Sequence, residues 1–142
     1  MKTKAVIVVF LVALVAMVAG SIYLSLTTER AEKSIVAVLA PDGKYKAVRL
    51  RVFGDKPEPY CVDTIAIFLS VYPDSFVASE RNYEVYGGRC PAPDKREALP
   101  KIEWTGNTSV RITYAAVPGA PPPRLKERDA SLFVDITNVK VE

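Results

Sequence analysis

The sequence predicts an all-β domain, mainly an antiparallel sheet folded as a sandwich or partial barrel, that follows one N-terminal transmembrane helix. Three observations support this: a long uncharged segment near the N-terminus, short alternating segments separated by proline and glycine, and two cysteines. Residues 1–28 carry only two charged side chains, and all 11 prolines lie after them. We therefore expect a membrane anchor at residues 1–27, a linker at 28–34 and an exported β domain at 35–142.

The anchor is predicted from an uncharged run that begins at Ala5 and ends at Leu26. A helix of about 20 such residues spans a bilayer, because all of its backbone groups are paired internally. Lys2 and Lys4 precede the run, and the charges that follow it cancel. The positive-inside rule then places the N-terminus in the cytoplasm and the C-terminal domain outside it.

A cleavable signal peptide is the alternative to the anchor. The segment Val18-Ala19-Gly20 is an acceptable small-residue cleavage site, so residues 1–20 would be removed. The apolar run continues for six residues beyond this site, and a cleaved peptide has no need of that extension. Both interpretations place the β domain in an exported compartment.

The two cysteines, Cys61 and Cys90, are expected to form a disulfide, because an even count in an exported domain is typical of one. The chain contains no histidine. This excludes Ser-His-Asp sites and histidine-based metal sites, and two lone sulfurs make a poor metal site. We expect no cofactor and no bound metal.

The clearest predicted strand is residues 45–53, where apolar and polar side chains alternate. It pairs with residues 35–39 through a turn at 41–44, in which Pro and Gly have the backbone angles that a turn requires. Arg49 and Arg51 lie on the polar side of this strand. They are expected to be part of the solvated face of the sheet. The alternative is that they form a small positive stripe for binding.

Five further strands are predicted from alternation and from flanking turn residues. A helical turn is expected at residues 95–99 or 124–130. The proline-rich segment 118–123 is interpreted as a stiff spacer, and the alternative is that it binds to a partner as a polyproline ligand. The five further strands span residues 64–72, 82–86, 102–104, 110–115 and 132–141.

Little in the chain indicates catalysis. It has no nucleotide-binding glycine motif, no Walker loop and no calcium-binding loop. Carboxylate pairs such as Asp74 with Glu80, or Glu80 with Glu84, suit acid–base work on sugars, but they are expected to be solvated surface groups. Apart from Lys2 and Lys4 the chain is nearly neutral, which does not favour nucleic-acid binding.

The predicted disulfide suggests where a partner would bind. It would bring two proline-stiffened loops, residues 54–60 and 91–100, side by side. We predict a partner-binding edge there, since cross-linked loops lose little entropy on binding and since Tyr and Arg often anchor interfaces. The alternative is that the disulfide only ties long loops to a small core. The predicted partner-binding residues are Lys56, Tyr60, Lys95 and Arg96.

Two segments carry a resemblance to a family. The Pro-Asp-Gly-Lys-Tyr turn at residues 41–45 opens an alternating strand, and the pair 102–104 and 110–114 follows later. Together they resemble small exported bacterial domains of uncharacterised function. The resemblance implies a bacterial envelope location and a β-rich fold, and it brings no active-site residues. We therefore expect the anchor in the bacterial cytoplasmic membrane and the β domain in the periplasm or outside.

The function predicted from these observations is a non-enzymatic, membrane-anchored protein-binding module. It would act as an accessory subunit of an envelope complex or as an immunity or inhibitor protein. Two alternatives remain open: a small envelope enzyme acting on cell-wall glycans, and a cleaved, secreted binding protein.

Overall fold

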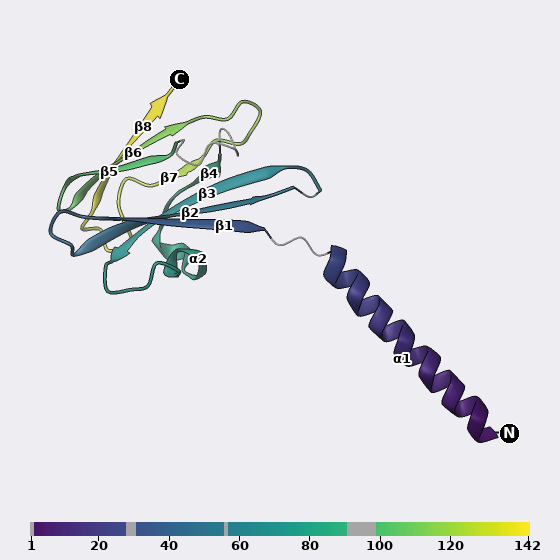
Figure 1. Cartoon of the computed structure of the whole chain (residues 1–142). Helices are drawn as coiled ribbons and strands as arrows, with labels where there is room; N and C mark the ends of the chain where they lie inside the picture. The colour runs from purple at the N-terminus through teal and green to yellow at the C-terminus, as the bar shows by residue number, and fades with distance from the viewer. Residues whose placement is uncertain (1, 28–30, 56, 91–98) are drawn as a thin grey trace. The chain divides into compact units, whose positions relative to one another are not determined.

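The computed structural model describes residues 2–27, 31–55, 57–90 and 99–142. The chain divides into two compact units, residues 1–30 and residues 31–142 (Figure 1). The first unit is a single helix and the second is a β domain. The prediction of an all-β domain with one N-terminal apolar helix is confirmed.

Helix α1 spans Lys2–Thr27 and is apolar on every side. Its large side chains are at least half exposed, from Leu14 at 50% to Met17 at 76%. The hydroxyls of Ser21 and Ser25 donate to backbone carbonyls one turn earlier, so these two hydroxyls are satisfied within the helix. The helix is long and apolar enough to cross a membrane, and a signal sequence meets the same criteria.

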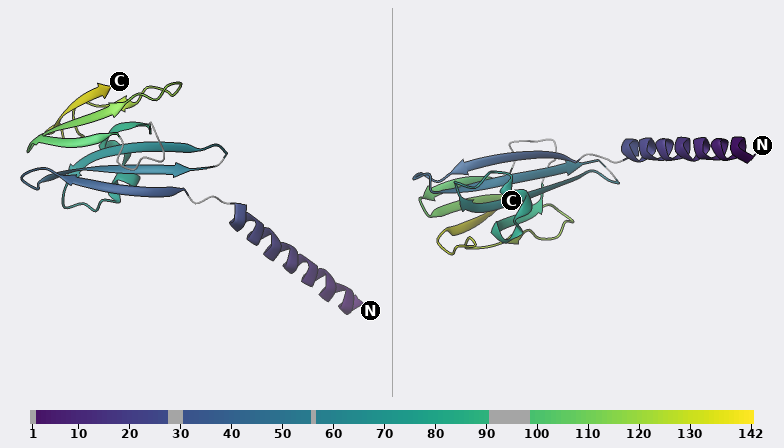
Figure 2. Two further views of the ribbon diagram at one scale, coloured as in Figure 1. Left: turned by 45° about the horizontal axis from the view of Figure 1, so that its top comes forward. Right: turned by 90° about the horizontal axis from the view of Figure 1, so that it is seen from below.

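The β domain contains two sheets, which we name sheet A and sheet B (Figure 2). All neighbouring strands of sheet A are antiparallel, whereas the last pair of sheet B is parallel. In spatial order, sheet A comprises β1 (Glu32–Leu39), β2 (Tyr45–Gly54), β3 (Tyr60–Leu69), β4 (Glu84–Arg89) and β7 (Arg124–Leu125). Sheet B comprises β5 (Lys101–Gly106), β6 (Ser109–Ala115) and β8 (Asp135–Val141).

Both faces of the central strands β2 and β3 of sheet A are covered. Alternate residues of β2 and β3, such as Ala47 and Ile65, pack against sheet B around Ile112. The opposite face packs under a short helix, α2 (Phe76–Ser79), and a 3-10 turn, η1 (Arg81–Tyr83). The residues buried on that second face are Val48, Leu50, Ala66, Phe68 and Val77.

The covering by sheet B corrects the prediction for Arg49 and Arg51. Their alternation with the apolar residues of β2 is as predicted, but they lie on the face that meets sheet B. Arg51 is 2% exposed and Arg49 is half-buried, so neither belongs to a solvated face.

Several element boundaries also differ from the sequence prediction. Strand β1 begins at Glu32, within the expected linker, because its pairing with β2 continues to Phe53. Residues 124–130 contain strand β7 in place of a helical turn. The last strand begins at Asp135, three residues later than expected. The helical turn considered at 95–99 lies almost entirely outside the described residues. Helices α2 and η1 are too short to produce a detectable periodicity.

Candidate functional site

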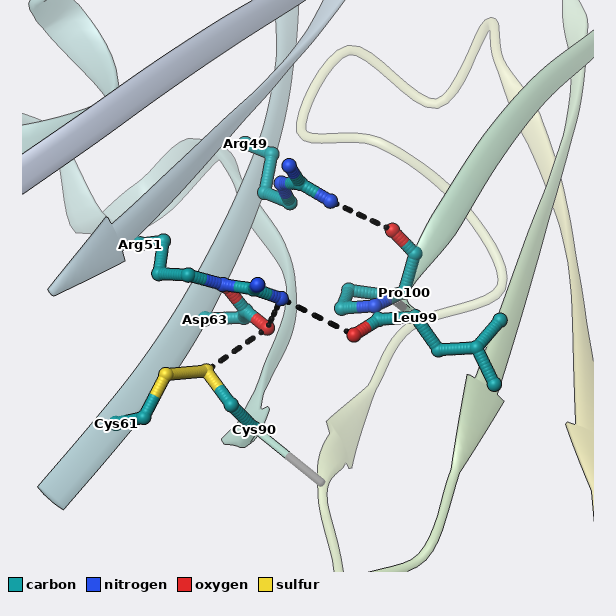
Figure 3. The surroundings of a disulfide bond; sticks show 7 residues. All are labelled: Arg49, Arg51, Cys61, Asp63, Cys90, Leu99 and Pro100. Carbon is teal, nitrogen blue, oxygen red and sulfur yellow. Dashed lines mark hydrogen bonds and ion pairs between the residues drawn. A yellow bond between two sulfur atoms is a disulfide. The ribbon is translucent and has the colours of Figure 1, made fainter. Parts of the chain in front are cut away.

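The predicted disulfide is present at one end of sheet A (Figure 3). The Cα atoms of Cys61 and Cys90 are 5.2 Å apart, and both residues are buried. Asp63, which is fully buried two residues after Cys61, lies against the disulfide: its Oδ2 is 3.1 Å from the Cys90 Sγ. The disulfide therefore borders a buried polar cluster, and not a hydrophobic core.

A paired charge forms the centre of this cluster. Arg51 donates from Nε and from Nη2 to the two carboxylate oxygens of Asp63, each at 2.8 Å. This hydrogen bond raises the pKa of Arg51, since it favours the charged guanidinium. A bidentate geometry of this kind is what allows an ion pair to remain buried.

The same arginines hold the chain that leads into sheet B. Arg51 Nη2 also donates to the Leu99 carbonyl at 3.1 Å, and Arg49 Nη1 donates to the Pro100 carbonyl at 3.2 Å (Figure 3). Burial lowers the pKa of Arg49, but an arginine remains charged in proteins. The cluster thus joins β2, β3, the disulfide and the start of β5, and its geometry is that of a structural tie.

The partner-binding residues predicted from the sequence lie beside this cluster or outside the described residues. Tyr60 is half-buried, and its ring lies across Gly54: a Cβ atom at that glycine would be 2.7 Å from the ring. Tyr60 therefore packs back onto the β2–β3 hairpin. Lys56, Lys95 and Arg96 lie outside the described residues, so a binding edge formed by the two loops stays a prediction.

A cavity of about 330 Å³ lies at the opposite end of sheet A, where β2 begins and β3 ends. Its walls are mostly aromatic and come from segments far apart in the sequence. We name it the aromatic pocket. Its lining residues are Lys44, Tyr45, Phe68, Leu69, Tyr72, Tyr83, Asp129, Ser131 and Phe133.

Aromatic contacts fix one wall of the aromatic pocket. The Phe68 ring meets Tyr83 edge-on at 6.2 Å between centroids, and Tyr72 stacks on Phe76 at 4.9 Å. Below them the buried Lys46 Nζ donates to the Tyr72 carbonyl and to Asp74 Oδ1, the latter at 2.6 Å. These contacts hold the wall in place before any ligand arrives, which lowers the entropy cost of binding.

A tight loop forms the other rim of the pocket. Asp129 is 2% exposed and accepts hydrogen bonds from Ser131 N, Ser131 Oγ and Val134 N. Leu132 adopts φ 65°, a left-handed conformation that is costly for a leucine. The side chain of Asp129 therefore holds the loop in a conformation that its sequence does not favour.

This loop displays two large apolar side chains. Phe133 is 71% exposed and Leu132 is 66% exposed, and Val71, next to the lining residue Tyr72, is 82% exposed. They are the three most exposed large apolar side chains in the described part of the β domain. Phe133 lines the aromatic pocket, and Leu132 and Val71 are each next in sequence to a lining residue. Exposed apolar groups close to a pocket are typical of a protein-interaction site.

The carboxylates considered for sugar chemistry are bound elsewhere. Asp74 pairs with Lys46, and Glu84 pairs with Arg124 at 2.7 Å. Each of these two carboxylates is therefore already engaged by a cation of the chain itself. The arrangement does not support that pair of roles for these residues.

The aromatic pocket was not predicted from the sequence. Residues 132–141 were expected to form one strand, whereas β8 begins at Asp135 and Leu132 lies in the loop before it with its side chain exposed. The available signal was Asp129 two residues before Ser131, a spacing typical of an Asx-type turn. Comparison of the chain with protein-family models, curated proteins and solved structures gave no match, so the resemblance noted above stays a prediction.

Proposed function

We propose that this chain is a membrane-anchored, extracytoplasmic protein-binding module without enzymatic activity, and that it binds its partner through the aromatic pocket and the loop that carries Leu132 and Phe133. The observation that carries the proposal is that the loop holds Leu132 in a strained backbone conformation while the side chains of Leu132 and Phe133 are exposed. A folded domain gains nothing in its own stability by holding a leucine at φ 65° with its side chain in water. Such strain is common where a surface has been shaped for binding.

The occupant that fits the pocket is one apolar or aromatic side chain of a partner protein. A volume of about 330 Å³ is at the lower limit for ligand sites, which span about 300–1,000 Å³. It suits a single anchoring side chain better than an extended glycan. Leu132, Phe133 and Val71 would surround that anchor and exclude water from it, as residues around a binding hot spot do.

Two features support the exported, anchored location. Helix α1 is exposed and apolar on every side, so lipid is the environment in which its surface is stable. The Cys61–Cys90 disulfide is stable in an oxidising compartment, which lies outside the cytoplasm. Lys2 and Lys4 lie in the first turn of α1, and by the positive-inside rule they favour an N-terminus in the cytoplasm with the β domain in the periplasm or outside.

The test is purification of the tagged full-length protein from its own cells in a neutral detergent. The changed variant is L132S/F133S, and the matched control is I35S/V36S, which removes two neighbouring, exposed apolar side chains of β1. We expect the wild-type and control proteins to retain a stoichiometric partner. The L132S/F133S variant should lose it by about tenfold or more, with an unchanged melting temperature.

Two results contradict the proposal: L132S/F133S retains the partner as well as the wild type does, or both double variants lose it equally. The identity of a retained partner separates the two roles considered. An accessory subunit retains a protein of the same cells, whereas an immunity or inhibitor protein retains one only after the cells meet an incoming protein.

A further inference from the structure

A second cavity, of about 290 Å³, lies beside the β7 edge of sheet A, and we name it the basic pocket. Three of its five lining residues are cations and one is a carboxylate: Arg81, Arg124 and Lys126 against Glu84, with Val85 as the fifth. The local charge is therefore positive by two. The aromatic pocket does not include any of these residues.

The strongest sign that the basic pocket is a built site is the way Arg124 is held. Its Nε donates to Glu84 Oε1 at 2.9 Å, and its Nη2 lies 2.7 Å from the same oxygen as an ion pair. The Glu84 side chain is only 17% exposed, while that of Arg124 is 76% exposed. A mostly buried carboxylate thus orients an arginine that is otherwise free to move in solvent, and it leaves the Nη1 group of that arginine for other acceptors.

Gly87 makes room for this ion pair. A Cβ atom at Gly87 would lie 2.6 Å from Glu84 Oε1 and 2.7 Å from Arg124 Nη2. The pair therefore lies directly over the backbone of β4, where Gly87 is paired with Arg124 in the sheet. Any larger residue at position 87 would displace the guanidinium.

The position of Lys126 is fixed through its backbone. Its N–H donates to the Val85 carbonyl at 2.9 Å, and its own carbonyl accepts from Asn138 Nδ2 at 2.9 Å. The segment that carries Arg124 and Lys126 is therefore attached both to β4 and to β8. The two cations emerge two residues apart from a fixed stretch of chain.

We propose that the basic pocket binds a phosphate group. Two uncompensated positive charges match a phosphate monoester, which carries about −1.5 to −2 at neutral pH. An oriented guanidinium beside a lysine supplies the charge-assisted hydrogen bonds that phosphate oxygens accept. Phosphate oxygens are offered by free inorganic phosphate and by the headgroup of an anionic lipid, whose phosphodiester carries a single negative charge, and the probes below separate these sources.

The experiment is an NMR titration of the full-length protein in neutral detergent at constant ionic strength, followed at the backbone amide of residue 87, whichever residue occupies that position. The probes are inorganic phosphate, dihexanoylphosphatidylglycerol and the zwitterionic dihexanoylphosphatidylcholine. We expect saturable shifts, with an affinity that falls about tenfold in R124Q, since it loses a charge-assisted contact. The control R111Q removes the cation of the exposed Arg111–Glu103 pair in sheet B and should leave the affinity unchanged.

The variant G87A makes the test specific, because it moves the ion pair without changing any charge. The displaced atoms are the ends of flexible side chains, so the fold should accept the new methyl group. We expect about threefold weaker binding or more in G87A as Arg124 loses its orientation. The control G106A adds a methyl group whose nearest neighbours are 3.8 Å away, and its affinity should match the wild type.

Saturation by inorganic phosphate identifies a free phosphate site, and saturation by the phosphatidylglycerol probe alone identifies a headgroup site. Either result supports the proposal when R124Q and G87A weaken binding. The absence of a saturable shift with all three probes would overturn it. So would shifts of the same size and midpoint in the wild type, R124Q and G87A, because these would report a diffuse attraction to the surface.

Discussion

Replacing Leu132 by glycine is expected to stabilise the β domain while it weakens binding at the aromatic pocket. The left-handed backbone of Leu132, with φ 65°, costs a leucine about 1–2 kcal/mol, whereas glycine adopts it freely. Against this, glycine makes the unfolded chain more flexible, which costs about 0.5–1 kcal/mol. Leu132 is 66% exposed, so its removal sacrifices little buried apolar surface.

The balance is a gain of about 0.5–1 kcal/mol in the free energy of unfolding. For a domain of this size the melting temperature should rise by about 3–6 °C. The assay is thermal and urea unfolding of the full-length protein in neutral detergent, with L132A as the matched variant. L132A removes nearly the same side chain but keeps a Cβ atom at the left-handed position, so it should not gain stability.

Both variants lose the Leu132 side chain and should therefore weaken partner binding by a similar factor. A variant that is more stable but binds its partner less well is the result expected if the strained backbone at Leu132 serves partner binding at a cost in stability. If L132G is less stable than L132A, the loop is not strained and the argument from Leu132 fails. If L132G and L132A bind the partner as the wild type does, Leu132 is not part of the interface.

Three further predictions concern the buried cluster and its neighbours. D63N should lower the free energy of unfolding by about 3–5 kcal/mol, because it leaves Arg51 buried without its partner. The double variant R51M/D63L should recover most of this loss in urea unfolding. A loss below about 1 kcal/mol in D63N would contradict the pairing. C61S/C90S should lower the free energy of unfolding by about 3–4 kcal/mol, since the disulfide joins residues separated by 29 positions. Equal melting temperatures for the wild type with and without reductant would refute this. Burial raises the pKa of Tyr86 to about 12 from 10.0, so between these pH values the native state keeps this proton while the unfolded state loses it. The contribution of Tyr86 to the free energy of unfolding should therefore be constant below pH 10 and decline between pH 10 and 12. Y86F should lack that part of the decline. Parallel pH profiles for Y86F and the wild type would show that Tyr86 does not contribute.

The parts of the fold that could be predicted are those that depend on local pattern or on compartment. The alternation in residues 45–53 correctly separates the two sides of β2, and the uncharged run correctly marks α1. The disulfide followed from an even cysteine count in a domain that the sequence predicts to be exported. In each case a short stretch of sequence, or the count of one residue type, contains the information.

The parts that could not be predicted depend on what the rest of the chain covers. Periodicity groups Arg49 with Arg51, but it does not say which side of β2 meets sheet B, a sheet made of strands that come later in the chain. The buried position of Arg51 is acceptable only because Asp63 on the next strand pairs with it. Similarly, residues 132–141 contain an alternating pattern, but Asp129 accepts hydrogen bonds from Ser131 and Val134 and so delays the strand until Asp135.

The candidate site was the least predictable feature for the same reason. The aromatic pocket joins the start of β2, the end of β3, η1 and the loop before β8, and no one segment indicates it. The basic pocket depends on Gly87, whose role appears only when β7 is placed beside β4. The glycine pair at 87–88 was visible in the sequence, but its purpose was not.

The most direct test of the central claim is photo-crosslinking in the cells that produce the protein. A benzophenone amino acid is placed at position 133, on the rim of the aromatic pocket, and in a separate variant at Thr105, an exposed residue of β5. We predict one dominant adduct from position 133 with a protein of the envelope, and its loss when Leu132 is also changed to serine. Equal adducts from positions 133 and 105, or an adduct from 105 alone, would contradict binding at the aromatic pocket.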